Sequence, residues 1–379
     1  MNNFISNLLN KIKHNYKDIF SSSFFATLMA IMIGMFFGLL VMLIANPSNA
    51  MAGFGKLLFG GFTKFGDVLY FATPILMTGL AVGFAFKMGL FNIGASGQYT
   101  MGLFFALYVG LMWDLPAGIH WIVAVLAAMI GGMLWGVIPG ILKAHLNVNE
   151  VITSIMLNYI GVYLVDFLIK NNGTLFISVE SRTKYLPESV QSLTLGIPGS
   201  NANITFIIAV GIAVLMYIIL KKTTFGYELV ATGMNKHASE YAGINYKRNT
   251  IIAMLISGGL AGLGGAFAIL APSNIAGASM TYEPVGIIAA NGFNGIAVAL
   301  LGNSNPVGIV FSALFISHIQ RGGTQTSLFG YKPEIVDVVI SIIIYFSAFA
   351  LLMSHSIGKY LKSRKEKKEL KNEISKEGK

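Results

Sequence analysis

The chain has 379 residues, of which 55 % are hydrophobic and only 11 % are charged, whereas soluble domains average about 25 % charged residues. Together with a mean hydropathy of +0.69, this composition excludes an ordinary soluble enzyme, a disordered protein and a coiled coil. It indicates an integral membrane protein. The chain has no cysteine, which excludes a disulfide scaffold, a thiolate metal site and a cysteine nucleophile.

The net charge of +10 is confined to three segments of the chain. Residues 1–20 carry +2, residues 221–248 carry +3 and residues 356–379 carry +5. A nucleic-acid-binding protein gathers its basic residues on one folded face, so this distribution argues against a nucleic-acid partner. It indicates instead which segments of a membrane protein face the cytoplasm.

The apolar segments predict an all-α membrane protein with about ten transmembrane helices, because one span needs about 20 mainly apolar residues. The uncharged stretch 284–320 is too long for a single span, and the turn at 303–306 divides it. The expected spans are residues 22–45, 68–88, 97–113, 119–142, 150–169, 203–220, 249–270, 284–302, 306–320 and 334–354.

Basic residues predict the orientation of these spans. With the N-terminus inside, 19 basic residues face the cytoplasm and 7 face outward, which is the bias typical of membrane proteins. An even number of spans then returns the C-terminus to the cytoplasm. The expected parts are a cytoplasmic segment 1–21, a transmembrane domain 22–355 with an outer loop 171–202 and a cytoplasmic loop 221–248, and a basic tail 356–379.

The sequence contains no motif of a catalytic site. It lacks G-x-x-x-x-G-K-[ST], H-E-x-x-H and G-x-S-x-G, which are the signatures of phosphate loops, zinc proteases and serine hydrolases. Its six His residues are scattered, and we expect no metal site. Glu150 and Asp166 lie at the ends of expected spans, whereas ion-driven transporters usually carry carboxylates near mid-membrane. These observations argue against an enzyme and against an ion-driven transporter.

Glycine is the most informative residue inside the spans, with 43 in the chain. Small residues spaced four apart let helix backbones approach closely in lipid. We therefore expect close helix packing at three small-residue faces, which comprise Gly34 and Gly38, then Gly132, Gly136 and Gly140, and finally Gly258, Gly262, Gly264 and Gly265.

Two apolar stretches, 71–102 and 284–308, are interrupted by Pro, Gly and Asn in the two halves of the chain. Matching interruptions of this kind indicate a transport pathway built on an internal repeat, because irregular backbone at membrane depth is tolerated only when it is buried or lines a wet cavity. The alternative for each amide is that it pairs with backbone groups of the broken helix. The candidate pathway residues are Asn92, Gln98, Asn158, Asn291, Phe293 and Asn294.

The cytoplasmic loop 221–248 is too long for a simple turn between spans. We expect residues 226–243 to hold a short helix that docks on a soluble partner, since interfaces are anchored by aromatic residues. The alternative is a linker that lies on the membrane surface. The predicted docking residues are Gly226, Tyr227, Glu228, Ala231, Gly233, Asn235, Ala238, Tyr241 and Gly243.

Four stretches carry a family resemblance, namely LFNIGASGQYTMG, NEVITSIMLNYI, FGYELVATGMNKHASEYAGI and GFNGIAVALLGNSNPVG. In order and spacing they resemble the permease subunits of bacterial ABC importers for simple sugars and nucleosides, over about residues 70–350. The extra first span and the long outer loop are similar to the larger permease of nucleoside importers fed by a lipoprotein receptor. The chain departs from the family at Ser96, where Glu is usual, and at Val230, where Arg is common.

The resemblance implies a division of labour among subunits. Two permeases, identical or different, would enclose one pathway in the bacterial cytoplasmic membrane. Cytoplasmic ATPases would bind ATP and grip the 221–248 loops, and an external lipoprotein would deliver the solute, so that the permease itself needs no cofactor and performs no covalent chemistry. Nucleosides are the expected solutes. The alternatives are a ribose-type sugar permease, a secondary transporter or facilitator of the same solutes, and a membrane scaffold.

Overall fold

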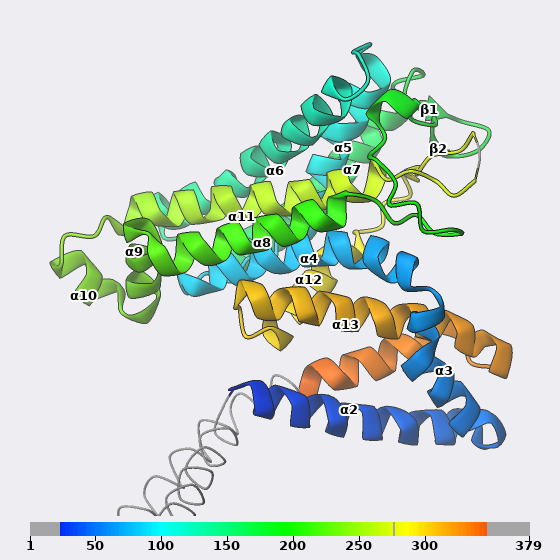
Figure 1. Ribbon diagram of the computed structural model, residues 1–379. Coiled ribbons are helices and arrows are strands. Elements are labelled where there is room, and N and C mark those ends of the chain that lie inside the picture. The colour runs from blue at the N-terminus through cyan, green and yellow to red at the C-terminus, as the bar shows by residue number, and fades with distance from the viewer. Residues whose placement is uncertain (1–22, 276, 347–379) are drawn as a thin grey trace, which may run out of the picture. The chain divides into compact units, whose positions relative to one another are not determined.

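The computed structural model of the chain describes residues 23–275 and 277–346 (Figure 1). The expected N-terminal segment 1–21 and the basic tail 356–379 lie outside these described residues. The described part is mostly helical and forms two compact units. One unit contains the described residues up to 55 and from 326 onward, and the other contains residues 56–325.

The first unit pairs α2 (Ser23–Ala45) with a helix over residues 333–346. A Cβ atom added at Gly34 would lie 2.6 Å from Ile343 Cα, and one added at Gly38 would lie 2.7 Å from a Val339 methyl group. Only glycine permits helices to approach this closely. The small-residue face predicted in this first span is therefore confirmed as a packing face.

The remaining elements follow in chain order. Two of them, η1 (Pro47–Asn49) and α3 (Ala50–Thr63), fall in a stretch where the sequence predicted no helix. The others are α4 (Phe65–Lys87), α5 (Ala95–Met112), α6 (Ile119–Leu146), α7 (Glu150–Lys170), β1 (Phe176–Ile177), β2 (Arg182–Thr183), η2 (Glu188–Val190), α8 (Thr205–Lys222), α9 (Thr224–Met234), α10 (Lys236–Tyr241), α11 (Tyr246–Ile269), α12 (Ala290–Leu301), α13 (Pro306–Thr324) and η3 (Gln325–Phe329).

Six helices of the described residues are long and apolar enough to cross a membrane, namely α2, α4, α6, α7, α8 and α11. The expected span 284–302 differs from the structure, because only Ala290–Leu301 is helical there. A helix of 12 residues is about 18 Å long, well short of the ~30 Å hydrocarbon core. Pro284 lacks an N–H group and Gly286 has a φ of +75°, so both oppose a helix before residue 290.

The two long loops also differ in detail from the expectation. The loop 221–248 holds two helices rather than one, because Asn235 ends α9 and its side chain accepts a hydrogen bond from Ala238 N at the start of α10. The outer loop contains the short antiparallel pair of β1 and β2, which the all-α prediction lacked.

Helix α11 lies at the centre of the second unit, beside α4 and α6 (Figure 1). The glycine faces predicted on α6 and α11 meet each other: a Cβ atom at Gly136 would lie 2.8 Å from Gly258 Cα, and one at Gly262 would lie 2.9 Å from Gly132 Cα. Because residue numbers rise along one helix as they fall along the other, α6 and α11 are antiparallel. Their predicted role in packing is confirmed.

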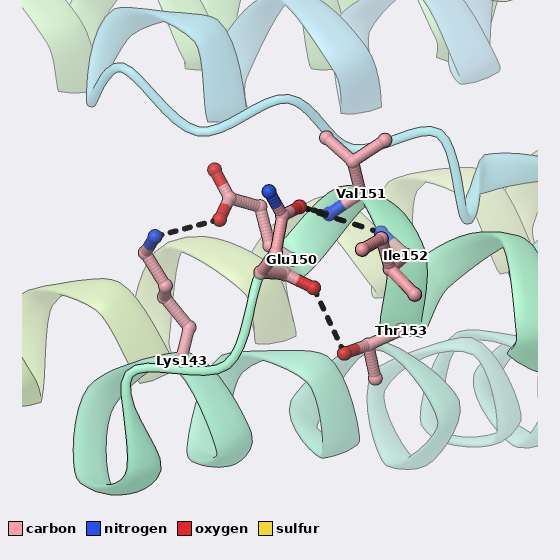
Figure 2. Close-up of polar contacts among 6 residues, drawn as sticks. Lys143, Glu150, Val151, Ile152 and Thr153 are labelled. Atoms are coloured by element: carbon pink, nitrogen blue, oxygen red, sulfur yellow. Dashed lines mark hydrogen bonds and ion pairs between the residues drawn. The ribbon is translucent and has the colours of Figure 1, made fainter.

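The turn between α6 and α7 shows how the sequence starts a helix (Figure 2). The Asn149 side chain accepts hydrogen bonds from the N–H groups of Val151 at 2.9 Å and Ile152 at 3.4 Å, and it caps α7 as predicted. Glu150 in the first turn forms an ion pair of 2.8 Å with Lys143 of α6. These contacts fix where α7 begins, and hence the position of Asn158 along it.

Candidate functional site

The first interrupted stretch breaks after α4 and not within it. Pro74, where a break was expected, lies inside α4, and the hydroxyl of Thr78 donates a hydrogen bond of 3.0 Å to its carbonyl oxygen. The break spans residues 88–94, where Gly89 has a φ of +73°. A left-handed residue of this kind ends a helix and suits glycine.

This break brings the chain back between the helices before α5 begins. The hydroxyl of Ser257 lies 2.7 Å from Asn92 Nδ2 and donates a hydrogen bond of 2.6 Å to the carbonyl oxygen of Ala81. Asn92 therefore lies level with Ala81, about 9 Å from the end of α4 at a rise of about 1.5 Å per residue. Helix α5 thus begins among the other helices of this unit, and not level with the end of α4.

The polar groups of this first break are paired with one another. Asn92 Nδ2 donates to Gln98 Oε1 at 2.8 Å, and Gln98 Nε2 donates to Asn92 Oδ1 at 3.2 Å. Asn158 of α7 accepts a hydrogen bond from Gly97 N at 2.8 Å and donates one to the carbonyl oxygen of Ile93 at 3.0 Å. The three amide side chains belong to residues that are at most 1 % exposed. Their geometry fits the alternative role considered for them, which is to satisfy the backbone of a broken helix.

The second interrupted stretch begins α12 directly beside the start of α5. The hydroxyl of Ser96 donates to the carbonyl oxygen of Ala289 at 3.1 Å, and Asn291 Nδ2 donates to Tyr99 Oη at 3.0 Å. A Cβ atom at Gly292 would overlap the backbone of Ser96, so only glycine allows this approach. Segments about 190 residues apart in sequence therefore meet at one point.

From this point the two short helices run toward opposite ends of the second unit. Along α12, Gly295 faces Thr78 and Val298 faces Gly79, and Ser304 just beyond the helix faces Gly83, so α12 runs in the same direction as α4. Helix α5 runs the other way, toward the outer loop, where Gly110 faces Leu186. Discontinuous helices whose N-termini meet in this way are characteristic of transporter binding sites.

One face of α12 is uncovered. Phe293 is 42 % exposed, and Asn294 is half-buried with no hydrogen-bond partner for its amide among the described residues. In the preceding connector, residues 277–289, Val285 and Ile287 are exposed as well. Because non-helical backbone at membrane depth must be buried in protein or line water, this face needs a covering partner or a wet passage.

The connector itself is held in place by a buried carboxylate. Asp166, near the C-terminal end of α7, accepts hydrogen bonds from Tyr282 Oη and Gly286 N, both at 2.7 Å. The outer loop adds a hydrogen bond of 2.9 Å from Thr183 N to the carbonyl oxygen of Tyr282. Asp166 was expected only at the end of a span, with no role of its own, whereas in the structure it anchors the connector.

The predicted docking residues of the cytoplasmic loop divide into two groups. An inner group holds α9 against its neighbours: Gly226 is buried on the α8 backbone, and Glu228 accepts a hydrogen bond of 3.0 Å from Asn249 Nδ2. The outer group is accessible, led by Tyr227 at 72 % and Tyr241 at 96 % exposure. Of the other predicted residues, Ala231 is half-buried, and the exposed ones are Gly233, Asn235, Ala238 and Gly243.

Sequence reasoning missed some residues of both regions. Ser257 is a single hydroxyl in a long apolar segment, and Tyr99 stands between two other polar residues, so no pattern distinguishes either of them. Met234 is 84 % exposed at the end of α9. The signal that could have found Met234 is a large apolar side chain next to Gly233 in an otherwise polar loop.

Comparison with known proteins identifies the family. Residues 64–348 match the family model described as branched-chain amino acid transport system / permease component. The chain belongs to this family. It is therefore a multi-pass membrane permease, as the sequence analysis inferred, and it is not an enzyme. No solved structure matches the chain.

Several curated relatives align over most of their length. The chain is 38 % identical over 347 residues to the guanosine ABC transporter permease protein NupP of Bacillus subtilis (strain 168), covering 88 % of this chain and 96 % of the relative. It is 37 % identical to the nucleoside ABC transporter permease protein NupB of Lactococcus lactis subsp. cremoris, covering 86 % and 91 %. A more distant relative, at 29 % identity and 74 % coverage of both chains, is the glucose ABC transporter permease protein TsgB13 of Haloferax volcanii.

Proposed function

We propose that this permease is the membrane-spanning subunit of an ATP-driven importer of nucleosides, which pass beside the start of α12. The observation that carries the proposal is the meeting of the starts of α5 and α12 inside the helical layer, in a chain 38 % identical to a guanosine permease. Alternating access then requires that these half-helices move relative to their surroundings.

The proposed topology has ten crossings with both ends in the cytoplasm. Six are the long helices, and α5, α13, the helix over 333–346 and the connector together with α12 supply the rest. The opposite directions of α5 and α12 support an internal repeat in which each half contributes one discontinuous helix. The 19-to-7 distribution of basic residues supports the orientation.

The exposed loop tips allow a test of this topology, since the chain has no native cysteine. Val179, 97 % exposed in the outer loop, and Tyr241, 96 % exposed in the cytoplasmic loop, are the best labelling positions. On intact spheroplasts, an impermeant maleimide should label Val179→Cys and leave Tyr241→Cys unlabelled until the membrane is opened. The reverse pattern would contradict the orientation.

The proposed passage is lined by Phe293 and Asn294, while Asn92, Gln98 and Asn158 shape it by holding the start of α5. An amide both donates and accepts hydrogen bonds, which suits the hydroxyl groups of a ribose and the polar edge of a base. A phenyl ring packs on the face of a base. Helix α12 carries no charged residue, which suits a neutral solute that must be released again.

Three partners complete the proposed importer. A second permease, identical or homologous, covers the exposed face of the connector and α12, which lipid cannot cover because the connector has non-helical backbone. A cytoplasmic ATPase binds the exposed side chains of α9 and α10. A substrate-binding lipoprotein docks on the outer loop 171–202.

The decisive experiment measures uptake in a strain that lacks this permease, with and without the restored gene. Radiolabelled guanosine, uridine and ribose are compared. We expect restored uptake of the nucleosides only, and we expect it to stop when the nucleotide-binding lysine of the partner ATPase is replaced. Uptake of ribose alone would favour the sugar-permease alternative, and uptake that persists without ATP hydrolysis would favour a secondary transporter.

A further inference from the structure

Helix α9 touches the rest of the permease at an unusually close point. A Cβ atom at Gly233 would overlap the carbonyl oxygen of Lys87 and would lie 2.8 Å from the carbonyl carbon of Met88. From the other side, a Cβ atom at Gly89 would lie 3.5 Å from Gly233 Cα. The backbones of α9 and of the turn that ends α4 are therefore in direct contact, with no side chain between them.

This turn leads directly to the site. The turn is held firmly in place. Met88 and Leu90 are both buried, and the N–H groups of Gly89 and Leu90 donate hydrogen bonds of 2.9 and 3.1 Å to carbonyl oxygens in the last turn of α4. Asn92 follows, with its hydrogen bonds to Gln98 and Ser257. A displacement of the turn therefore displaces the start of α5.

The start of α5 is in turn bound to α12. The hydrogen bond of Ser96 to the carbonyl oxygen of Ala289 and the close approach of Gly292 connect the two half-helices. A continuous series of backbone contacts and hydrogen bonds thus runs from α9 to the start of α12. Packed interiors of this kind transmit small shifts rather than absorbing them.

We infer that Gly233 and Gly89 form the contact that transmits movement of α9 to the starts of α5 and α12. They are positioning residues for transport, and the inference rests on the proposed function. A glycine pair suits this task because two backbones in van der Waals contact leave no flexible side chain to absorb the motion. Tight packing alone would make the same contact, so the test has to measure coupling rather than assembly.

The test uses the complete importer in nanodiscs, and compares three variants. Gly233→Ala places a methyl group against the Lys87 carbonyl oxygen. Gly211→Ala is the matched control, because a Cβ atom there meets no atom within 4 Å. Met234→Glu alters an exposed side chain of the same helix and should weaken the hold of the ATPase. The readouts are ATPase co-purification, basal ATP hydrolysis, its stimulation by loaded binding protein, and guanosine uptake.

Per assembled complex, Gly233→Ala should lose stimulation by loaded binding protein and guanosine uptake by at least tenfold. Gly211→Ala should behave as the wild type, and Met234→Glu should lose ATPase co-purification. Stimulation and uptake of Gly233→Ala within twofold of the wild type would overturn the inference, as would a loss of uptake that merely parallels a loss of the assembled complex. A wild-type complex without guanosine uptake would overturn the proposed function and this inference together.

A second pair of variants keeps the test decisive if Gly233→Ala does not accumulate. Asparagine tolerates the positive φ of Gly89, whereas a β-branched residue does not. Gly89→Asn should therefore retain coupled hydrolysis, and Gly89→Val should lose coupling at a comparable level of assembled complex. Equal coupling in the two variants would overturn the inference.

Discussion

The two interrupted stretches look alike in sequence and differ in structure. The first, at residues 88–98, turns its amides inward: Asn92 and Gln98 are buried and bond to each other. The second, at the start of α12, leaves Phe293 exposed and the amide of Asn294 without a partner among the described residues. The first break holds the backbone at the start of α5 in place, while the second exposes an aromatic and an amide side chain of α12.

The difference shows that a polar residue in a membrane span has two distinct uses. A buried amide that pairs with free backbone groups stabilises an irregular segment, because each unpaired group would be costly in that setting. An amide that is left half-exposed is available to a solute or to another subunit. Substitutions in the two regions should therefore affect different quantities, stability in the first and transport kinetics in the second.

The largest expected effect comes from Asn158→Leu in the first region. It leaves the N–H group of Gly97 and the carbonyl group of Ile93 unpaired, and a buried unpaired group costs about 1–3 kcal/mol each. We expect a marked drop in melting temperature and in the amount of permease in the membrane. The control is Asn171→Leu at the exposed end of the same helix. An equal drop in both variants would contradict the inward role of Asn158.

A smaller effect is expected from Asn294→Leu in the second region. Loss of one net hydrogen bond to the solute, worth about 1 kcal/mol, reduces the uptake efficiency roughly fivefold. The melting temperature should stay at the wild-type value, because no described residue pairs with this amide. Initial rates of guanosine uptake over a range of concentrations provide the measurement. Unchanged kinetics would remove Asn294 from the proposed passage.

The smallest effect is expected from Lys143→Met at the turn that starts α7 (Figure 2). The ion pair with Glu150 lies close to the surface, with the Lys143 side chain 21 % exposed, and such pairs contribute about 0–1 kcal/mol. Glu150 also remains favourable at a helix N-terminus without its partner. Asn149→Ala should lower the melting temperature more, since loss of a helix cap costs about 1 kcal/mol. The opposite ranking would mean that the ion pair, and not the cap, positions α7.

Much of the fold could be predicted from local patterns. The glycine faces of α6 and α11 and the cap at Asn149 appear as expected, because a helix face and a helix start are set by neighbours a few residues away. The predictions failed where the backbone is not regularly helical or where a helix is short. Residues 284–289 looked like the start of a span because they are uncharged, and α3 was missed because its apolar run is short and interrupted by Lys56.

The candidate site shows the same limit at the level of single residues. Ser192 and Ser239 lie in two polar loops, yet both are buried. Gly233 was predicted to dock on a soluble partner, and in the structure it also packs against the carbonyl oxygen of Lys87. In each case a segment distant in sequence decides the environment, and no local pattern contains that information.

From the sequence alone it follows that this chain is a helical membrane protein, which of its segments are apolar, and to which family it belongs. Composition is enough for the first two conclusions, because lipid imposes the same requirements on every span, and the family follows from four sequence stretches in a characteristic order and spacing. The folded chain is needed to show that Asn92 and Asn158 are satisfied while Asn294 has no partner among the described residues, since the partners of Asn92 and Asn158 include groups 165 and 65 residues away. A hydrogen bond depends on the position and direction of both groups, and only folding brings distant groups together.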